Sequence, residues 1–283
     1  MEWLGTQDGL RLAADMAPGW RQIPVVLLHG GGQTRHAWGA TATLLSERGW
    51  STVSVDLRGH GDSDWSPAGN YGLEDFAADV ASIAGSFDAP PVLVGASLGG
   101  LASLLALTGP APPAATALVL VDVAHRFEHD GAQPIVDFMQ ANPEGFETPG
   151  DAELAVAAYL PHRRPPDDPN GILKNLRRRE GRWHWHWDPS LLRSQRPLVE
   201  PPAARERARR LADGIRALSV PVLLIRGTIS GVVTPEIAAE FSELNERAEV
   251  VEVAGAGHMV AGDRNDAFAG AVLSFLEERV PAA

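Results

Sequence analysis

Short runs of apolar residues alternate with helix-forming segments through the first half of the chain. The runs are continuous and rich in Val and Leu, which indicates strands buried on both faces of a parallel sheet. Between them, apolar positions recur at helical spacing. The expected strands are Val25–Leu28, Ser51–Val55, Pro91–Val94 and Ala117–Val123, and the expected helices are Trp38–Arg48, Leu73–Phe87 and Gly100–Leu107.

The alternation stops near Ala124 and resumes near residue 217. Residues 126–216 are rich in Pro, Arg and Trp and contain no strand-like run. We therefore expect a core domain made of residues 1–125 and 217–283, with residues 126–216 inserted as a helical lid. The elements expected after the lid are a strand Val220–Ile225, a helix Pro235–Asn245, a strand Ala248–Val253 and a helix Asp263–Glu278.

Charge and composition narrow the kind of partner. The formal net charge is −12, and residues 126–216 are nearly balanced, with 15 basic and 14 acidic side chains. An acidic chain without a basic face is a poor candidate for nucleic acid. The chain has no Cys, no apolar run of the ~18 residues that a membrane span needs, and no N-terminal segment resembling a signal peptide. We expect a cytoplasmic protein, a monomer or homodimer, that acts on a small molecule without a metal, another cofactor or a membrane.

The pentapeptide Gly95–Gly99, with the sequence Gly-Ala-Ser-Leu-Gly, carries the strongest chemical signal. It follows an apolar run and precedes a helix-forming segment, which is the context of a nucleophile elbow. The glycines allow a sharp turn with the Ser97 hydroxyl exposed at its tip. Ser97 is therefore the candidate nucleophile.

A serine nucleophile needs a base and donors for the developing oxyanion. His258 lies in a glycine-rich loop after the last expected strand, in the right chain order for the base. The run His29–Gly32 follows the first strong strand and resembles an oxyanion loop. We assign the donors to the backbone N–H groups of Gly31 and Leu98, with Gly32 as second choice, and expect His29 to brace the loop.

Together these residues resemble the α/β-hydrolase fold family over nearly the whole length. Asp56–Ser63, with the sequence Asp-Leu-Arg-Gly-His-Gly-Asp-Ser, is similar to the family's loop after the next strand. The nearest group is the lidded hydrolases that include esterases, cofactor-free haloperoxidase-like enzymes, epoxide hydrolases and carbon–carbon bond hydrolases. This resemblance implies an α/β fold with a mostly parallel, eight-stranded sheet flanked by helices.

The resemblance also implies an acid after the strand that follows the lid, in a pattern close to Gly-x-x-Ser-Asp-x-Val. This chain has Gly231 where that Asp would stand, and no carboxylate lies between Ile225 and Glu236. Three explanations stay open. Asp122, at the end of another strand, replaces the acid; a Ser97–His258 dyad works with Ser230 or a water; or the site has lost hydrolysis and binds a ligand. Gly231 is either the natural residue or an introduced substitution.

A serine at the elbow favours esters, lactones, thioesters or activated ketones over epoxides. We expect a serine hydrolase that cleaves a carboxylic ester or lactone of medium size and apolar character through an acyl-enzyme on Ser97. The alternatives are a carbon–carbon bond hydrolase or perhydrolase on the same residues, and a catalytically impaired scaffold that binds a ligand.

The expected pocket combines the oxyanion loop with the first lid helix. We place Gly32, Arg35, Phe138 and Met139 in it, with Arg35 within reach of a substrate carboxylate. The run Arg177–Arg179 is a solvated face or, less often, an anion clamp.

Tryptophan and histidine alternate in the lid between positions 183 and 187. Trp183, Trp185 and Trp187 should share one face of an extended segment and wedge the lid onto the core. His184 and His186 would lie on the other face, and a metal site there is the less favoured reading.

Overall fold

The computed structural model describes residues 1–161, 171–195, 201–260 and 265–281. Asp263, the expected start of the last helix, lies outside the described residues, and α10 begins at Asn265. Within the described residues no helix is both long enough and apolar enough to span a membrane.

An eight-stranded, mostly parallel sheet forms the core, in the order β1-β2-β4-β3-β5-β6-β9-β10. The chain is an α/β fold, as the sequence predicts. The first two strands pair antiparallel with each other, and β2 also runs antiparallel to β4. The strands are β1 (Glu2–Gly5), β2 (Arg11–Ala17), β3 (Pro24–Leu28), β4 (Ser51–Val55), β5 (Val92–Ala96), β6 (Ala117–Val121), β9 (Val222–Gly227) and β10 (Ala248–Val253).

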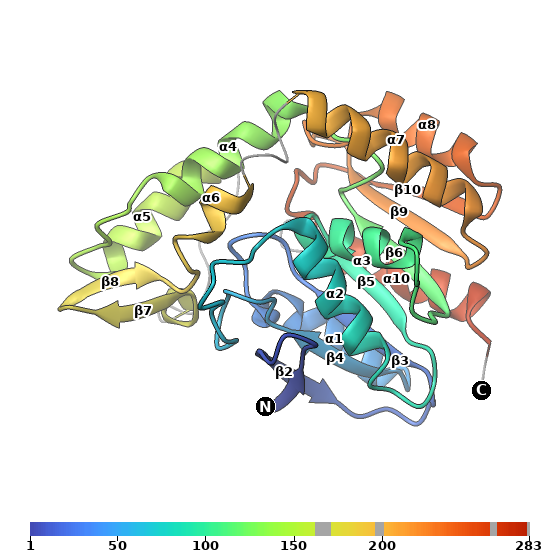
Figure 1. The fold of residues 1–283 in the computed structure, drawn as a ribbon, viewed down its shortest axis with the longest axis horizontal. Coiled ribbons are helices and arrows are strands. Elements are labelled where there is room, and N and C mark those ends of the chain that lie inside the picture. Colours follow the sequence, from blue (N-terminus) through green and yellow to red (C-terminus); the bar gives the residue numbers. More distant parts are fainter. Residues whose placement is uncertain (162–170, 196–200, 261–264, 282–283) are drawn as a thin grey trace.

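Helices cover both faces of this sheet (Figure 1). Alternate residues of one strand serve opposite faces, as the period of two requires: Val26 and Leu28 join one buried cluster, and Val25 and Leu27 join the other. The core helices are the short 3-10 helix η1 (Arg35–Trp38), α1 (Gly39–Glu47), α2 (Leu73–Ala84), α3 (Leu98–Thr108), α8 (Pro235–Leu244) and α10 (Asn265–Arg279).

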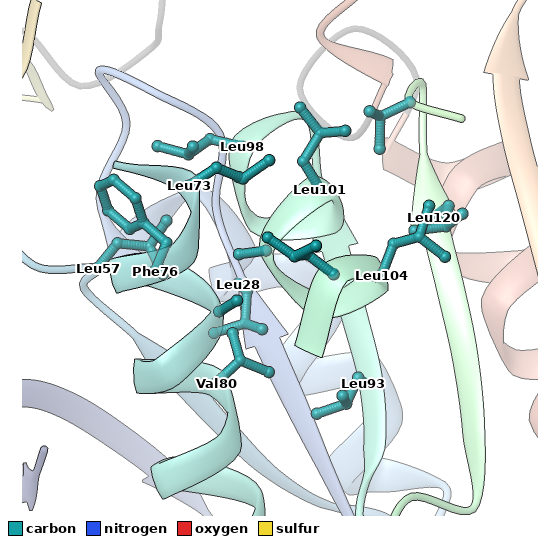
Figure 2. Close-up of a cluster of buried hydrophobic side chains, with 14 of the residues drawn as sticks. Leu28, Leu57, Leu73, Phe76, Val80, Leu93, Leu98, Leu101, Leu104 and Leu120 are labelled. Atoms are coloured by element: carbon teal, nitrogen blue, oxygen red, sulfur yellow. The ribbon is translucent and has the colours of Figure 1, made fainter. Parts of the chain in front are cut away.

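The larger cluster joins α2 and α3 to the sheet, directly beneath the elbow (Figure 2). Its burial holds α3 against the strands, and α3 begins at the residue after Ser97. The labelled side chains come from β3, β5, β6, α2, α3 and the loop after β4, and are Leu28, Leu93, Leu120, Leu73, Phe76, Val80, Leu98, Leu101, Leu104 and Leu57.

The segment between β6 and β9 contains strands as well as helices. A two-stranded antiparallel sheet of β7 and β8 lies within it, which the sequence pattern does not predict because both strands are short and half-exposed. The elements are α4 (His129–Gln140), α5 (Pro149–Tyr159), η2 (Gly171–Asn175), β7 (Leu176–Arg179), β8 (Arg182–Trp185), α6 (Leu191–Gln195) and α7 (Pro201–Ala217).

Helices α4, α5 and α6 and the β7–β8 hairpin gather on one side of the sheet domain (Figure 1). By contrast, α7 packs onto the core, where Leu211 and Ile215 join the larger buried cluster. Gly214 of α7 leaves room for Thr108 of α3, because a Cβ at that position would overlap the threonine side chain. The lid boundaries at residues 126 and 216 stay a prediction.

Candidate active site

Ser97 stands at the turn between β5 and α3. Its backbone has φ 45° and ψ −110°, a conformation that non-glycine residues rarely adopt. The turn is tight: a Cβ on Gly95 would lie 2.5 Å from the amide nitrogen of Gly100, and one on Gly99 would lie 2.5 Å from the carbonyl oxygen of Leu28. The glycines of the motif are therefore required by close backbone approach.

Asp122 directly follows β6 and faces His258. The distance from Oδ2 of Asp122 to Nδ1 of His258 is 2.7 Å. Asp122 is fully buried, and its own backbone has φ 50°. Nδ1 of His258 therefore carries a proton and donates a hydrogen bond to the carboxylate, so that Nε2 is the acceptor nitrogen of the neutral imidazole.

The carboxylate of Asp122 is held by two further donors. The backbone N–H of Gly227 donates to Oδ1 at 3.3 Å, and the Ser230 hydroxyl donates to Oδ2 at 2.5 Å. The serine hydroxyl therefore binds the carboxylate and not the imidazole. Of the three explanations for the glycine at position 231, this geometry matches replacement of the acid by Asp122.

Two backbone N–H groups near Ser97 have no hydrogen-bond partner among the described residues, that of Gly31 in the loop after β3 and that of Leu98 at the start of α3. The N–H of Gly30 donates to Oε1 of Gln33 at 2.9 Å, and that of Gly32 donates to Nε2 of His60 at 3.1 Å. The N–H of Gly32, the second choice as a donor, is therefore already engaged, whereas that of Gly31, the first choice, is not.

Three buried histidines brace this loop. His29 accepts the N–H of Leu57 at 3.0 Å and lies 2.7 Å through Nδ1 from the carbonyl oxygen of Gly30. Nε2 of His186 lies 3.3 Å from the carbonyl oxygen of Gly32, and its Nδ1 accepts the N–H of Gly61 at 2.7 Å. Gly32 is thus held through its N–H by His60 and through its C=O by a histidine that follows β8.

Burial keeps these imidazoles neutral. It lowers the pKa of His29 to about 4 and that of His60 to about 3. It also lowers the pKa of His186 well below its ordinary value. The rings form one group, with centroids 5.0 Å apart between His29 and His60 and 5.8 Å apart between His60 and His186. A neutral ring offers one donor and one acceptor, which is what each of these hydrogen-bond pairs uses.

A cavity with two lobes opens over Ser97. The smaller lobe has a volume of about 240 Å³ and the larger one about 880 Å³. Gly32 and Phe138 line the smaller lobe, and Met139 lines both. The residues common to the two lobes are Gly31, Ser97, Ile135, Met139, Trp185, Trp187 and His258.

Arg35 is a correction to the expected pocket. Its guanidinium is buried and bound to three carboxylates, at 2.9 Å to Asp15, at 2.9 Å to Asp62, and in direct contact with Asp56. Because these partners neutralise the charge, Arg35 ties the loops after β3 and β4 to the sheet and does not face a substrate.

The segment between β6 and β9 contributes aromatic residues to the cavity, where Trp185 and Trp187 line both lobes, whereas the tryptophan pattern predicts only a contact with the core. The rings of Trp185 and Trp187 stack at 5.1 Å, and Trp185 also packs on Phe138 and Phe146. His186, which lies between these two tryptophans in the sequence, contacts the core through Gly32 and Gly61. Among the described residues no group of three or more His, Asp or Glu side chains could hold a metal ion.

Several cavity residues on the segment between β6 and β9 differ in how clearly the sequence marks them. Tyr159, Lys174 and Asn175 line the smaller lobe and give no clear signal in the sequence. Arg179 and His184 line the larger lobe and belong to runs that the sequence pattern marks. They lie on α5, η2 and the β7–β8 hairpin, whose placement over Ser97 depends on tertiary packing. The alternating run around position 185 and the arginine run before it are the only patterns that point to this region.

The family model described as the alpha/beta hydrolase family matches residues 25–271. The chain therefore belongs to the alpha/beta hydrolase family and is a hydrolytic enzyme. It is 33% identical over 268 residues to the esterase Rv0045c of Mycobacterium tuberculosis, covering 90% of this chain and 83% of that protein.

Three further similarities are found, one to a curated protein and two to solved structures. The 2-(acetamidomethylene)succinate hydrolase of Mesorhizobium japonicum is 32% identical over 221 residues, 76% of this chain and 74% of that protein. A crystal structure of E-2-(acetamidomethylene)succinate hydrolase superposes with a TM-score of 0.83 at 23% identity, covering 98% of both chains. A crystal structure of Rv0045c superposes with a TM-score of 0.71 at 28% identity, covering 98% of this chain and 90% of the other.

Proposed function

We propose that this enzyme is a serine hydrolase that cleaves a carboxylic ester, open or cyclic, through an acyl-enzyme on Ser97. The observation that carries the proposal is the 2.7 Å contact between Asp122 and His258 beside a cavity lined by Ser97. The 33% identity to a protein named an esterase also supports cleavage of an ester bond.

In the proposed mechanism His258 acts as the general base through Nε2. It takes the proton of the Ser97 hydroxyl as the oxygen attacks the substrate carbonyl carbon, and returns it to the leaving alcohol. A water then repeats the sequence on the acyl-enzyme, releasing the acid and restoring Ser97. Asp122 holds the Nδ1 proton and stabilises the imidazolium that forms in each half-reaction.

The oxyanion of each tetrahedral intermediate would be bound by the N–H groups of Gly31 and Leu98. Both are unpartnered among the described residues, and Leu98 is the first residue of α3, where helix N–H groups favour negative charge. His60 and His186 support this step by holding Gly32, the neighbour of Gly31.

The cavity supports a substrate of medium size with apolar parts. Ile135, Phe138, Met139 and Trp187 supply apolar lining next to Ser97. A catalytically impaired binding scaffold is the weaker alternative. It is argued from the missing carboxylate at position 231, but the carboxylate of Asp122 contacts His258 instead.

The test is intact-mass measurement after incubation with a fluorophosphonate, beside a Ser97→Ala control. We expect rapid addition of one label to the native chain and none to the control. A folded native chain that stays unlabelled would contradict the proposal and favour the binding scaffold.

A further inference from the structure

The charged side chains around the cavity are basic, although the protein is acidic. The chain carries a formal net charge of −12. Yet none of the described residues that line the two lobes is Asp or Glu, while Lys174 lines the smaller lobe and Arg179 and Arg193 line the larger one. A cleft with one sign of charge raises the local concentration of ligands of the opposite sign.

Arg179 is the most constrained of these cations. Its Nη2 donates to the carbonyl oxygen of Trp185 at 3.0 Å, and its guanidinium carbon lies 4.9 Å from the centre of the Trp65 ring. Within the described residues no carboxylate lies within salt-bridge distance of Arg179, and its buried Nε has no hydrogen-bond partner. Burial lowers the pKa of Arg179, and the charge of Asp188 opposes this effect only in part.

The two preceding arginines differ from Arg179 in their contacts. Arg177 donates to Asp62 at 2.6 Å and is therefore neutralised. Arg178 points to the other face of β7, as alternation along a strand requires, where its guanidinium lies 5.9 Å from the ring of Trp183. Of the three, only Arg179 combines partial burial, a fixed position and a place on the cavity wall.

We propose that Arg179 forms an anion subsite in the larger lobe, so that the substrate is an ester that also carries a free carboxylate. This inference rests on the proposed function. A guanidinium matches a carboxylate with two parallel hydrogen bonds, and such charge-assisted bonds are about twice as strong as neutral ones. Trp65 and the Trp185 carbonyl orient the guanidinium before the substrate arrives.

The experiment compares matched neutral and anionic esters. Because the carboxylate could lie on either side of the scissile bond, two pairs are needed: para-acetoxybenzoate with its methyl ester, and para-nitrophenyl hemiadipate with para-nitrophenyl hexanoate. We expect the native enzyme to prefer the anionic member of one pair by about tenfold to a hundredfold in kcat/KM, as one charge-assisted contact allows. The preference should weaken as ionic strength rises.

Three variants assign that preference to Arg179. Arg179→Gln should bring the ratio to about one, and Arg179→Lys, which keeps the charge but not the fork, should give an intermediate value. Arg178→Gln is the matched control and should keep the native ratio, since this neighbour does not line the cavity. The melting temperature of each variant establishes that it is folded.

The outcomes separate this inference from the proposed function. Hydrolysis of neutral esters with no preference for anionic ones would overturn the subsite and leave the hydrolase in place. If no ester is cleaved, calorimetry on Ser97→Ala decides: para-acetoxybenzoate should bind more tightly than its methyl ester, and Arg179→Gln should remove the difference. Equal binding of the two compounds would overturn the subsite.

Discussion

Ser97 and Asp122 leave neighbouring strands at the same level of the sheet. Ser97 follows Ala96 of β5, and Asp122 follows Val121 of β6. Ala96 and Val121 are paired across the two parallel strands. The N–H of Ser97 donates to the carbonyl oxygen of Val121 at 3.1 Å, and both residues have positive φ. The spacing between the elbow and the carboxylate is therefore set by strand pairing rather than by a loop.

Asp122→Asn should lower kcat on a neutral ester by about 10³–10⁴-fold, because the amide cannot hold the Nδ1 proton of His258 in the required tautomer. Steady-state kinetics and the rate of fluorophosphonate labelling measure the effect. Ser230→Ala is the control for the dyad explanation and should cost no more than about tenfold, because it removes one of several donors to the carboxylate. Native rates in Asp122→Asn would contradict the role of the aspartate.

Gly231→Asp tests whether the acid position implied by the family resemblance still limits activity. Because Asp122 already contacts His258, we expect no gain in kcat from this substitution alone. A strong gain would mean that Asp122 is a poor substitute. The double variant Asp122→Asn, Gly231→Asp is more informative. A higher kcat in the double variant than in Asp122→Asn alone, with no gain from Gly231→Asp in the native chain, would show that a carboxylate at either position can serve the imidazole.

His186→Phe should lower kcat more than it raises KM, because it removes the contact to the Gly32 carbonyl and loosens the loop that carries the Gly31 N–H. Loss of one oxyanion donor costs about 10²–10³-fold, so misplacement should cost less, about tenfold to a hundredfold. His186→Gln, which can still bond Gly32, should recover part of the rate. His129→Gln changes an exposed histidine at the start of α4 and should have no effect.

Stability should fall in acid because His29 and His60 are neutral in the folded protein. Their pKa values are lowered by burial to about 4 and about 3, whereas an unfolded histidine titrates near pH 6.5. The unfolded chain therefore binds more protons as pH falls from about 6.5, and the free energy of unfolding decreases down to about pH 4 for His29 and pH 3 for His60.

The loss for His29 alone should reach about 3 kcal/mol. Urea unfolding across this range measures it. His60→Gln removes one of the two groups, so its unfolding free energy should decline less steeply with acid than that of the native chain. An equal slope in both proteins would place the acid sensitivity elsewhere.

Gly131→Ala should destabilise the protein by about 1–3 kcal/mol, because a Cβ there would overlap the carbonyl oxygen of Gly231. Gly270→Ala is the matched control on α10: a Cβ at Gly270 meets no atom within 4 Å, so this change should stabilise by about 0.5–1 kcal/mol. Thermal or urea unfolding compares the two. A neutral Gly131→Ala would mean that α4 can shift without cost.

The core strands and the elbow follow from the sequence because they are coded locally. Continuous apolar runs mark β3, β5, β6 and β9. The strands β1, β7 and β8 are short and at most partly buried, so they carry no comparable signal. Cytoplasmic location and oligomeric state stay predictions.

The site depends on contacts between distant segments, and there the sequence is less informative. The three carboxylates around Arg35 come from positions 15, 56 and 62 and meet only in the folded chain. The choice between Asp122 and Ser230 as the partner of His258 likewise needs the geometry, since both follow strands that end at the same edge of the sheet.

Gly131 of α4 and Gly231 of the loop after β9 meet backbone to backbone. On the proposed function, Asp122 frees this loop from supplying an acid, and the loop serves instead as the surface on which α4 rests. Selection on the loop would then act through the position of α4, whereas selection on the strand ends would act through the catalytic reaction. The two properties could therefore evolve separately, which would allow the lid to adapt to new substrates without a change in the catalytic residues.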